Sequence, residues 1–355
     1  MGADTLEEQL KENSREGELY ETLDNGDIRC YACGHRCLIK DGYPGICKVR
    51  FNDNGTLKVP HQYVGGLQWD PIEKKPFYHA LPGSSVLSFG MMGCDFHCSY
   101  CQNWITSQAL RDANAGAPVQ EMSSDSLVET ARNRGADSIV STYNEPLITS
   151  EWAKEVFTSA KHHDLLTGYI SNGNGTERVL DYLEPCVDLY KVDLKSFRES
   201  TYRELGGVLE NTLETLEMLH EKDFWLEVVT LVVPGFNDSE EELRDIAAFL
   251  SSLSDDIPWH VTAFHKDYEM QEKENTSPEK LIQAAEIGKE EGLNFVYAGN
   301  LPGQVGDFEN TYCPDCDELL VERYGHKIFS QHITEEGTCP ECERDIPGIW
   351  SEEQV

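Results

Sequence analysis

Long apolar runs and basic charge are both scarce in this chain of 355 residues. The longest apolar stretch, LEVVTLVVPGF at 226–236, is interrupted by charge and is far too short to cross a bilayer. Lys and Arg number 29 against 64 Asp and Glu, which gives a net charge of −35. This charge opposes non-specific binding to nucleic acid or to an anionic membrane, and its spread along the chain predicts adaptation to a high-salt cytoplasm.

Targeting signals are also missing from the sequence. The amino terminus, MGADTLEEQLKENSREGELY, is polar and acidic and has no signal-peptide h-region. Leu6 stands where the myristoylation pattern requires Ser or Thr. We therefore expect a cytoplasmic protein, in which the 12 cysteines are thiols or metal ligands rather than disulfides.

The chain divides into four segments by composition. We predict an acidic lead-in at 1–27, mobile or helical, and a four-Cys module with a proline-punctuated connector at 28–82. A regular βα pattern follows at 83–305, and a small Cys-rich module ends the chain at 306–355. Within the second segment, Asn54-Gly55 predicts a hairpin.

Short β-branched or apolar runs alternate with amphipathic helical stretches in the third segment. The predicted strands are 85–90, 137–143, 166–171, 188–194, 225–233, 259–264 and 294–299. The predicted helices include apolar faces at 148–160 and 209–219, and one that begins after Ser239 with a capping box to Glu242. No GxGxxG fingerprint follows a strand, which disfavours a Rossmann sheet. We predict an α/β fold, a full or partial (β/α) TIM-type barrel with small N-terminal and C-terminal Cys-rich modules.

Eleven of the cysteines fall into three sets, and Cys186 alone reads as a buried core thiol. The last cysteine set consists of two CxxC pairs, Cys313, Cys316, Cys339 and Cys342. Each CxxC turn presents two sulfurs, and a hairpin between the turns brings the pairs together. This spacing predicts a closed four-thiolate site that holds zinc, or iron of the rubredoxin type.

The first cysteine set also offers four thiolates, from Cys30, Cys33, Cys37 and Cys47. Its spacing is compatible with a structural zinc ion or with a second iron–sulfur cluster, and the two alternatives stay open. His35 lies inside the set and could replace one thiolate, although loop histidines are usually not ligands.

The middle cysteine set, Cys94, Cys98 and Cys101, follows a predicted strand and has no fourth cysteine nearby. His97 is a candidate substitute, but it lies between two ligands, where its ring would have to fold back. Three thiolates on a [4Fe–4S] cluster leave one iron open to a ligand that is not protein. At the carboxyl end of the first barrel strand, that iron would face the mouth where barrel enzymes do their chemistry.

The CxxxCxxC spacing, with Tyr100 before the last cysteine, resembles the radical S-adenosylmethionine (SAM) superfamily. The resemblance implies a [4Fe–4S] cluster that binds SAM and cleaves it reductively to a 5′-deoxyadenosyl radical, which abstracts hydrogen from a substrate. It extends to STYNEP (141–146), SNGNG (171–175), KVDLKS (191–196), LVVPGFND (231–238) and AFH (263–265). Residues at matching positions are then implied to contact SAM or substrate: Tyr100, Asn144, Glu145, Ser171, Asn172, Asp193, Lys195 and His265.

The order of the first cysteine set, DPIEKKPFYHALPGS, YNEP, YAGNLPG and the last cysteine set is similar to one subfamily. It resembles the pyruvate-formate-lyase-activating-enzyme-like radical SAM member of the AmmeMemoRadiSam system, in a haloarchaeal version. The resemblance implies Memo-type and AMMECR-type partners, an electron donor such as ferredoxin or flavodoxin, and a protein or peptide substrate. Ile170, where some glycyl-radical activating enzymes carry Asp, and Lys266, in place of an expected Pro, depart from that pattern.

Two other functions remain as alternatives to a protein-modifying enzyme. Three zinc sites would make the chain a non-catalytic interaction scaffold, and true glycyl-radical-enzyme activation is the second alternative. Modification of nucleic acid is disfavoured, because the net charge is −35 and no Lys/Arg cluster is interleaved with aromatic residues.

Overall fold

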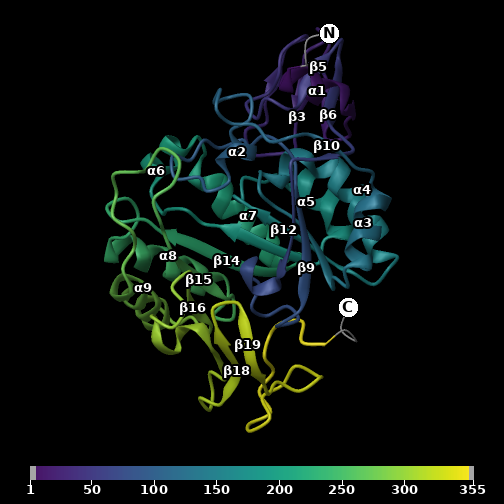
Figure 1. The fold of residues 1–355 in the computed structure, drawn as a ribbon. Helices are drawn as coiled ribbons and strands as arrows, with labels where there is room; N and C mark the ends of the chain where they lie inside the picture. The colour runs from purple at the N-terminus through teal and green to yellow at the C-terminus, as the bar shows by residue number, and fades with distance from the viewer. Residues whose placement is uncertain (1–4, 352–355) are drawn as a thin grey trace.

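The computed structural model describes residues 5–351 and has an eight-stranded sheet at its centre, in the order β16-β15-β14-β13-β12-β11-β9-β8 (Figure 1). Strands β9 to β16 of this sheet run parallel, and β8 (Gly66–Pro71) pairs antiparallel with β9. Since the order is linear, with β16 and β8 at the two edges, the sheet forms a partial barrel rather than the full barrel.

The parallel strands lie where the short apolar runs predicted them. They are β9 (Ser85–Gly90), β11 (Ser138–Ser141), β12 (Leu166–Ser171), β13 (Leu189–Asp193), β14 (Trp225–Val232), β15 (Trp259–Ala263) and β16 (Val296–Gly299). Along β13 the side chains alternate, with Tyr190 in the core against the helices and Lys191 and Asp193 lining a cavity. The carboxyl ends of these strands therefore share one rim.

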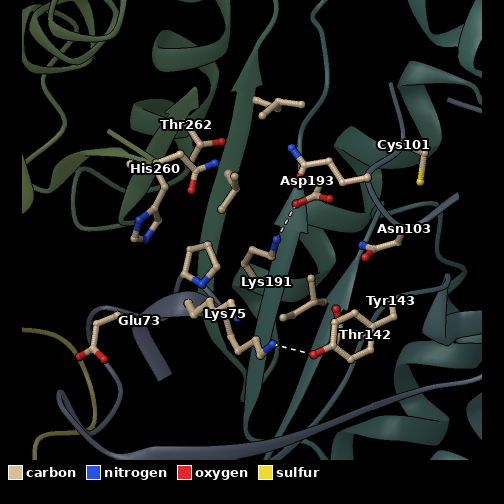
Figure 2. A pocket seen from close by; sticks show the side chains of 18 of the residues that line it. Glu73, Lys75, Cys101, Asn103, Thr142, Tyr143, Lys191, Asp193, His260 and Thr262 are labelled. Carbon is tan, nitrogen blue, oxygen red and sulfur yellow. Dashed lines mark hydrogen bonds and ion pairs between the residues drawn. The ribbon is translucent and has the colours of Figure 1, made fainter. Parts of the chain in front are cut away.

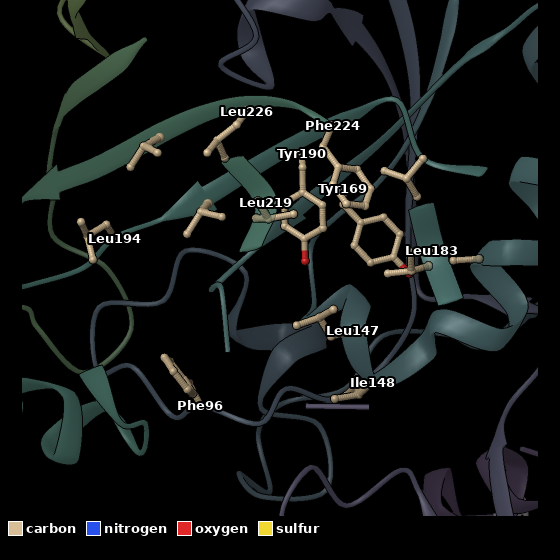
Figure 3. Packing of buried hydrophobic residues seen from close by; sticks show 14 of the residues in the cluster. Phe96, Leu147, Ile148, Tyr169, Leu183, Tyr190, Leu194, Leu219, Phe224 and Leu226 are labelled. Atoms are coloured by element: carbon tan, nitrogen blue, oxygen red, sulfur yellow. The ribbon is translucent and has the colours of Figure 1, made fainter. Parts of the chain in front are cut away.

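Helices connect the strands and cover the outer face of the sheet, where their apolar residues pack (Figure 3). They are α3 (Ser124–Asn133), α4 (Ser150–Lys161), α5 (Glu177–Leu183), α6 (Glu199–Leu205), α7 (Leu209–Glu221), α8 (Glu240–Leu253) and α9 (Pro278–Glu290). Tyr169 of β12 and Tyr190 of β13 contact each other beneath α5 and α7, with ring centroids 5.7 Å apart. This layer fixes the strands whose other face carries the polar residues.

Ser239 caps α8 as predicted, accepting a hydrogen bond from the backbone N–H of Glu242 at 3.3 Å. The expected return bond of the capping box does not form. The Glu242 carboxylate instead accepts from the Ser196 hydroxyl and from the Phe197 backbone N–H, so it ties α8 to the loop after β13.

The N-terminal part packs on the barrel near the rim and contains two small antiparallel sheets (Figure 1). Their strands are β1 (Ser14–Glu16), β5 (Phe51–Asp53) and β6 (Thr56–Pro60) in one, and β2 (Tyr20–Thr22), β3 (Ile28–Cys30) and β4 (Leu38–Ile39) in the other. The predicted lead-in is helical at α1 (Leu6–Glu12), and its strands β1 and β2 pair with β6 and β3. The Asn54-Gly55 hairpin joins β5 to β6, with both residues at positive φ.

A buried ion pair fastens this part to the barrel. The Arg50 guanidinium donates to both carboxylate oxygens of Glu151 at 2.7 Å, and both side chains are fully buried. Glu151 lies in the first turn of α4 and also accepts from the backbone N–H groups of Glu18 and Leu19. One carboxylate therefore holds three separate segments together.

The C-terminal module is a three-stranded antiparallel sheet of β17 (Thr311–Tyr312), β18 (Leu319–Tyr324) and β19 (Lys327–Gln331), at the opposite end of the molecule (Figure 1). Its apolar residues pack on Tyr78 and Tyr297, from the connector and β16. His79 joins the same contact, because its ring nitrogens face the Pro347 carbonyl at 2.7 Å and the Tyr297 hydroxyl at 2.6 Å.

Shorter elements complete the chain: β7 (Tyr63–Val64), β10 (Gln120–Glu121), α2 (Trp104–Ser107) and the 3-10 turns η1 (Ile72–Lys74), η2 (Pro146–Thr149), η3 (Glu184–Cys186) and η4 (Gly306–Glu309). Cys186 is a buried free thiol, as predicted. In residues 5–351, none of the helices has the length and apolarity needed to span a membrane.

Candidate active site

The middle cysteine set lies on the loop that leaves β9 at the rim of the sheet. Backbone bonds fix the start of this loop: the Met91 N–H donates to Asn144 Oδ1 at 2.9 Å, and the Gly93 N–H donates to the Thr106 carbonyl at 2.9 Å. Gly93 has φ of 93°, and a Cβ at this position would lie 3.0 Å from the Cys47 carbonyl oxygen. A side chain would not fit there, so glycine lets the loop approach the N-terminal part closely.

All three thiols of this set face one small cavity, the inner cavity, of about 100 Å³. No other cysteine lines it, and the rest of its wall is rich in amide, hydroxyl, carboxylate and ammonium groups: Asn103, Asn144, Glu145, Ser171, Asn172, Asp193 and Lys195. This donor set fits a [4Fe–4S] cluster with three protein thiolates, and the polar wall fits a zwitterionic ligand at the remaining iron.

Burial keeps these thiols protonated in the absence of a metal. It raises the pKa of Cys98 to about 12 and the pKa of Cys94 well above the usual value. For Cys101, burial also raises the pKa, against the Ser107 hydroxyl, which lies 3.2 Å from the sulfur. Since thiolates are the ligands of iron, cluster binding must release these protons.

Glu145 joins the ends of β11 and β12 beside the inner cavity. Its carboxylate accepts from the Ser171 hydroxyl at 2.7 Å, the Asn172 backbone N–H at 2.8 Å and the Leu147 backbone N–H at 3.1 Å. Burial and the nearby Asp95 raise the pKa of Glu145 to about 8. Each carboxylate oxygen has two lone pairs, so Glu145 retains capacity to accept a further donor.

Asp95 is the buried acid between the first and middle cysteine sets. It is fully buried, and the side-chain amides of Asn172 and Asn174 each donate to it at 2.7 Å. The SNGNG stretch therefore holds the cysteine loop through Asp95, in addition to lining the inner cavity. Only the position of Asp95 inside the CxxxCxxC motif hinted at this in the sequence.

Lys191, Asp193 and Lys195 form a charged row at the end of β13. Asp193 accepts from Lys191 Nζ at 2.6 Å and from Lys195 Nζ at 3.2 Å. Burial works against the charge on Asp193, but the two ammonium groups lower its pKa to about 2. Burial likewise works to lower the pKa of Lys195, yet Asp193 holds it well above the usual value. Asp193 and Lys195 are therefore ionised at neutral pH, whereas burial lowers the pKa of Lys191.

A larger space, the main cavity, has a volume of about 470 Å³ and shares Cys98, Cys101, Asp193 and Lys195 with the inner cavity. Figure 2 shows Lys75 reaching Tyr143 and Lys191 reaching Asp193 across this cavity, with His260 and Thr262 of β15 on its far wall. Lys75 Nζ donates to the Tyr143 hydroxyl at 2.9 Å and to Asp70 at 3.0 Å. The sequence did not indicate Lys75, His260 or His326 as lining residues, because they come from the connector, from mid-strand β15 and from the C-terminal module.

The remaining predicted contacts divide in two. Tyr100 is buried in the wall of the main cavity, and its ring meets Phe236 edge-on at 5.6 Å, so the predicted aromatic wall and the LVVPGFND element lie together. His265 is exposed, and the linings of the two cavities do not include it. His97 is also exposed and its ring lies against Gly206, so it is turned away from the three thiols.

The last cysteine set forms a compact group in the C-terminal module. Its four sulfurs all lie within 4.8 Å of one another, with Cys313 and Cys342 3.5 Å apart and Cys316 and Cys339 3.6 Å apart. Zinc–sulfur bonds of about 2.3 Å in a tetrahedron place sulfurs about 3.8 Å apart, so one metal ion fits at the centre. The predicted hairpin, β18–β19, lies between the two CxxC turns.

The chain is similar to several known proteins. The model of the Radical SAM superfamily matches residues 90–250. An uncharacterized protein of Methanocaldococcus jannaschii is 38% identical over 321 residues, which cover 90% of this chain and 93% of that protein. Pyruvate formate-lyase 1-activating enzyme of Escherichia coli strain K12 is 26% identical over 259 residues, 70% of this chain and 92% of that enzyme. The crystal structure of a domain of pyruvate-formate lyase-activating enzyme from Bacteroides vulgatus matches with a TM-score of 0.42 and 19% identity, over 46% of this chain and 100% of that one.

Proposed function

Because the chain belongs to the radical SAM superfamily, we propose that it is an enzyme that binds a [4Fe–4S] cluster through Cys94, Cys98 and Cys101. When bound, the cluster and SAM together supply reductive cleavage of SAM to a 5′-deoxyadenosyl radical, which abstracts hydrogen from a substrate. The observation that carries the proposal is the inner cavity, in which three thiols and no fourth cysteine face a polar wall. A closed structural zinc site takes four protein ligands, so three thiols without a fourth cysteine disfavour the zinc scaffold.

The protein's part is to orient SAM and to keep water from the reacting atoms. We assign Lys195 to the SAM carboxylate, and Glu145 with Asn144 to its ammonium group. Ser171 and Asn172 are assigned to the ribose or methionine portion, and Tyr100 to the adenine. These assignments are supported by the inner and main cavities, which the side chains line and which share Lys195, and Asp193 is assigned to positioning Lys195 through their 3.2 Å contact.

His265 has less support than the other carried-over residues. The resemblance implies that it contacts SAM or substrate, but its exposed side chain lies outside both cavities. β15 ends at Ala263 and Phe264 is buried, so the next residue points outward. His260, three residues upstream of Ala263, lines the main cavity and is therefore the better candidate on β15 for a contact with SAM or substrate.

We further propose a protein or peptide substrate. The main cavity opens between the barrel, the connector and the C-terminal module, which contributes His326 to the lining, so a docked chain could insert one side chain there. Activation of a glycyl-radical enzyme is the second candidate, favoured by the similarity to the Escherichia coli activating enzyme. Ile170 lines both cavities where some activating enzymes carry Asp, which disfavours that candidate.

The remaining assignments complete the proposal. The last cysteine set is assigned a structural zinc ion, and the division at 1–27, 28–82, 83–305 and 306–355 is kept as a division of roles. An electron donor such as ferredoxin or flavodoxin, Memo-type and AMMECR-type partners, a cytoplasmic site of action and adaptation to high salt remain proposals. The charge of −35 supports the last of these.

Deuterium transfer tests the substrate class. The reconstituted enzyme is supplied with SAM, dithionite and either the protein or the small-molecule fraction of a fully deuterated host extract, and 5′-deoxyadenosine is analysed by mass spectrometry. We expect deuterium in 5′-deoxyadenosine when the protein fraction is supplied. We expect none when that fraction has first been digested with protease. Deuterium from the small-molecule fraction alone would contradict a protein substrate without touching SAM cleavage itself.

A further inference from the structure

The first cysteine set forms a buried pocket of thiols in the N-terminal part, outside the site described above. Cys30 ends β3, and Cys33, Cys37 and Cys47 lie on the loops around β4. Cys30, Cys33 and Cys47 are each at most 6% exposed, Cys37 is half-buried, and all four are free thiols. Four cysteines at this spacing form a ligand set for a zinc ion or an iron–sulfur cluster, so the arrangement is that of a metal site.

The segments that carry the four thiols pack against one another. A Cβ at Gly45 would lie 3.7 Å from Cys37 Sγ, so the turn that leads to Cys47 packs against Cys37. The Cys30 N–H donates to the Cys37 carbonyl at 3.0 Å, so Cys30 at the end of β3 lies beside Cys37, the residue before β4. Arg36 and Lys48, next to Cys37 and Cys47, both adopt positive φ, at 44° and 71°. Such backbone is tolerated where the surroundings fix it, as around a bound group.

Sulfur spacing distinguishes this set from the last cysteine set. In residues 5–351, the last set is the one group of three or more Cys, His, Asp or Glu ligand atoms lying within 4.8 Å of one another. In the first set, no three of the four sulfurs lie that close together. One zinc ion needs its four sulfurs about 3.8 Å apart, whereas in a [4Fe–4S] cluster each thiolate binds a different iron and the sulfurs are more widely spaced.

The first and middle cysteine sets are also in direct structural contact. Arg111 donates to the Ile46 carbonyl at 2.6 Å and to the Phe96 carbonyl at 2.5 Å, one from each cysteine loop. The Cys47 carbonyl packs against Gly93, the residue before Cys94. Asp95 lies between the sets and raises the pKa of both Cys33 and Cys94. Two metal centres held here would be neighbours.

We propose that Cys30, Cys33, Cys37 and Cys47 hold a second [4Fe–4S] cluster, close enough to the middle cysteine set to exchange one electron with a cluster held there. A low-potential one-electron donor reduces the second cluster. Its reoxidation passes that electron to the neighbouring cluster, so no further reductant is needed. The first cysteine set thereby gives the buried barrel site an electron entry on the N-terminal side of the molecule.

The test uses two variants of the full chain, reconstituted anaerobically with iron and sulfide. The first, Cys94→Ala with Cys98→Ala and Cys101→Ala, removes the barrel cluster. It should keep about four iron and four sulfide per chain and show the signal of a reduced [4Fe–4S] cluster in electron paramagnetic resonance (EPR). Iron absent, with zinc rising to two ions per chain, would overturn the proposal, as would one iron per chain.

The second variant, Cys33→Ser with Cys47→Ser, should lower the iron content of the wild type from about eight to about four per chain. The reduced wild type should also give an EPR spectrum broadened by spin–spin interaction between neighbouring clusters. A spectrum equal to the sum of the two variants' spectra would refute the proximity. If the second variant fails to fold, the first variant decides the metal by itself. The electron exchange rests on the proposed function, whereas the iron content of the first variant tests the second cluster independently of it.

Discussion

Replacement of Lys195 by Met tests the residue that we assign to the SAM carboxylate. Lys195 lines both cavities, and it shares Asp193 with Lys191 at 3.2 Å and 2.6 Å respectively. The substitution leaves Asp193 paired with Lys191, so the site should keep its shape. A hydrogen bond to a charged group contributes about 1.5–3 kcal/mol, and about 1.4 kcal/mol corresponds to a tenfold change in affinity. Lys195→Met should therefore weaken SAM binding by about 10-fold to 100-fold.

The matched control is Lys191→Met, which removes the same charge from the same carboxylate. Lys191 lines the main cavity but not the inner cavity, so this variant should change the Kd for SAM by no more than about threefold. Isothermal titration of SAM into each reconstituted, unreduced protein gives the Kd values. Equal losses in both variants would show that the general positive field, and not a contact from Lys195, holds SAM. No loss in Lys195→Met would refute the assignment.

Three further predictions concern stability and metal content. Glu151→Gln should lower the free energy of unfolding in urea titration by about 3–5 kcal/mol, because it leaves Arg50 buried beside a neutral partner. Glu7→Gln, which breaks an exposed pair, should have no measurable effect. Equal stability of the two variants would contradict this. Burial lowers the pKa of His79 from 6.5 to about 4, so the unfolded chain binds the extra proton first as the pH falls. Stability should drop by about 3 kcal/mol between pH 6.5 and 4, and a His79→Gln variant with an unchanged pH profile would refute this cause. Cys316→Ser should remove one zinc ion per chain and speed hydrogen exchange in β18 while leaving iron content intact, and loss of iron instead would contradict a separate zinc site.

The sequence predicted the strands well, because each buried strand of the sheet is a short apolar run bounded by turns. β9 and β12 have the predicted bounds, and the other parallel strands end within two residues of them. The sequence also predicted that Cys94, Glu145 and Lys195 lie at one rim, since the carboxyl ends of parallel strands meet at the same edge of a sheet. The sequence did not decide between a full and a partial barrel, because the outcome depends on how the connector and β8 cover one edge of the sheet.

Contacts made across the chain were beyond the sequence. Lys75 and His326 come from segments whose position against the rim depends on tertiary packing, and neither carries a local pattern. His260 sits inside an apolar strand, where a histidine reads as a core residue. His265 lies two residues beyond the end of β15, where the regular alternation of side-chain directions along the strand has ended, and its side chain is exposed. The sequence did carry a signal for Lys191 as a lining residue, because it is spaced two residues from Asp193 and four from Lys195, as residues on one face of a strand are.

Release of 5′-deoxyadenosine from SAM under dithionite tests the central claim most directly. The wild type is compared with Cys98→Ala and with Cys186→Ala, a matched loss of another buried thiol that lies outside the three cysteine sets. We predict steady release by the wild type and by Cys186→Ala, and background release by Cys98→Ala. Release by Cys98→Ala at the wild-type rate would contradict a cluster held by the middle cysteine set, and with it the proposed function.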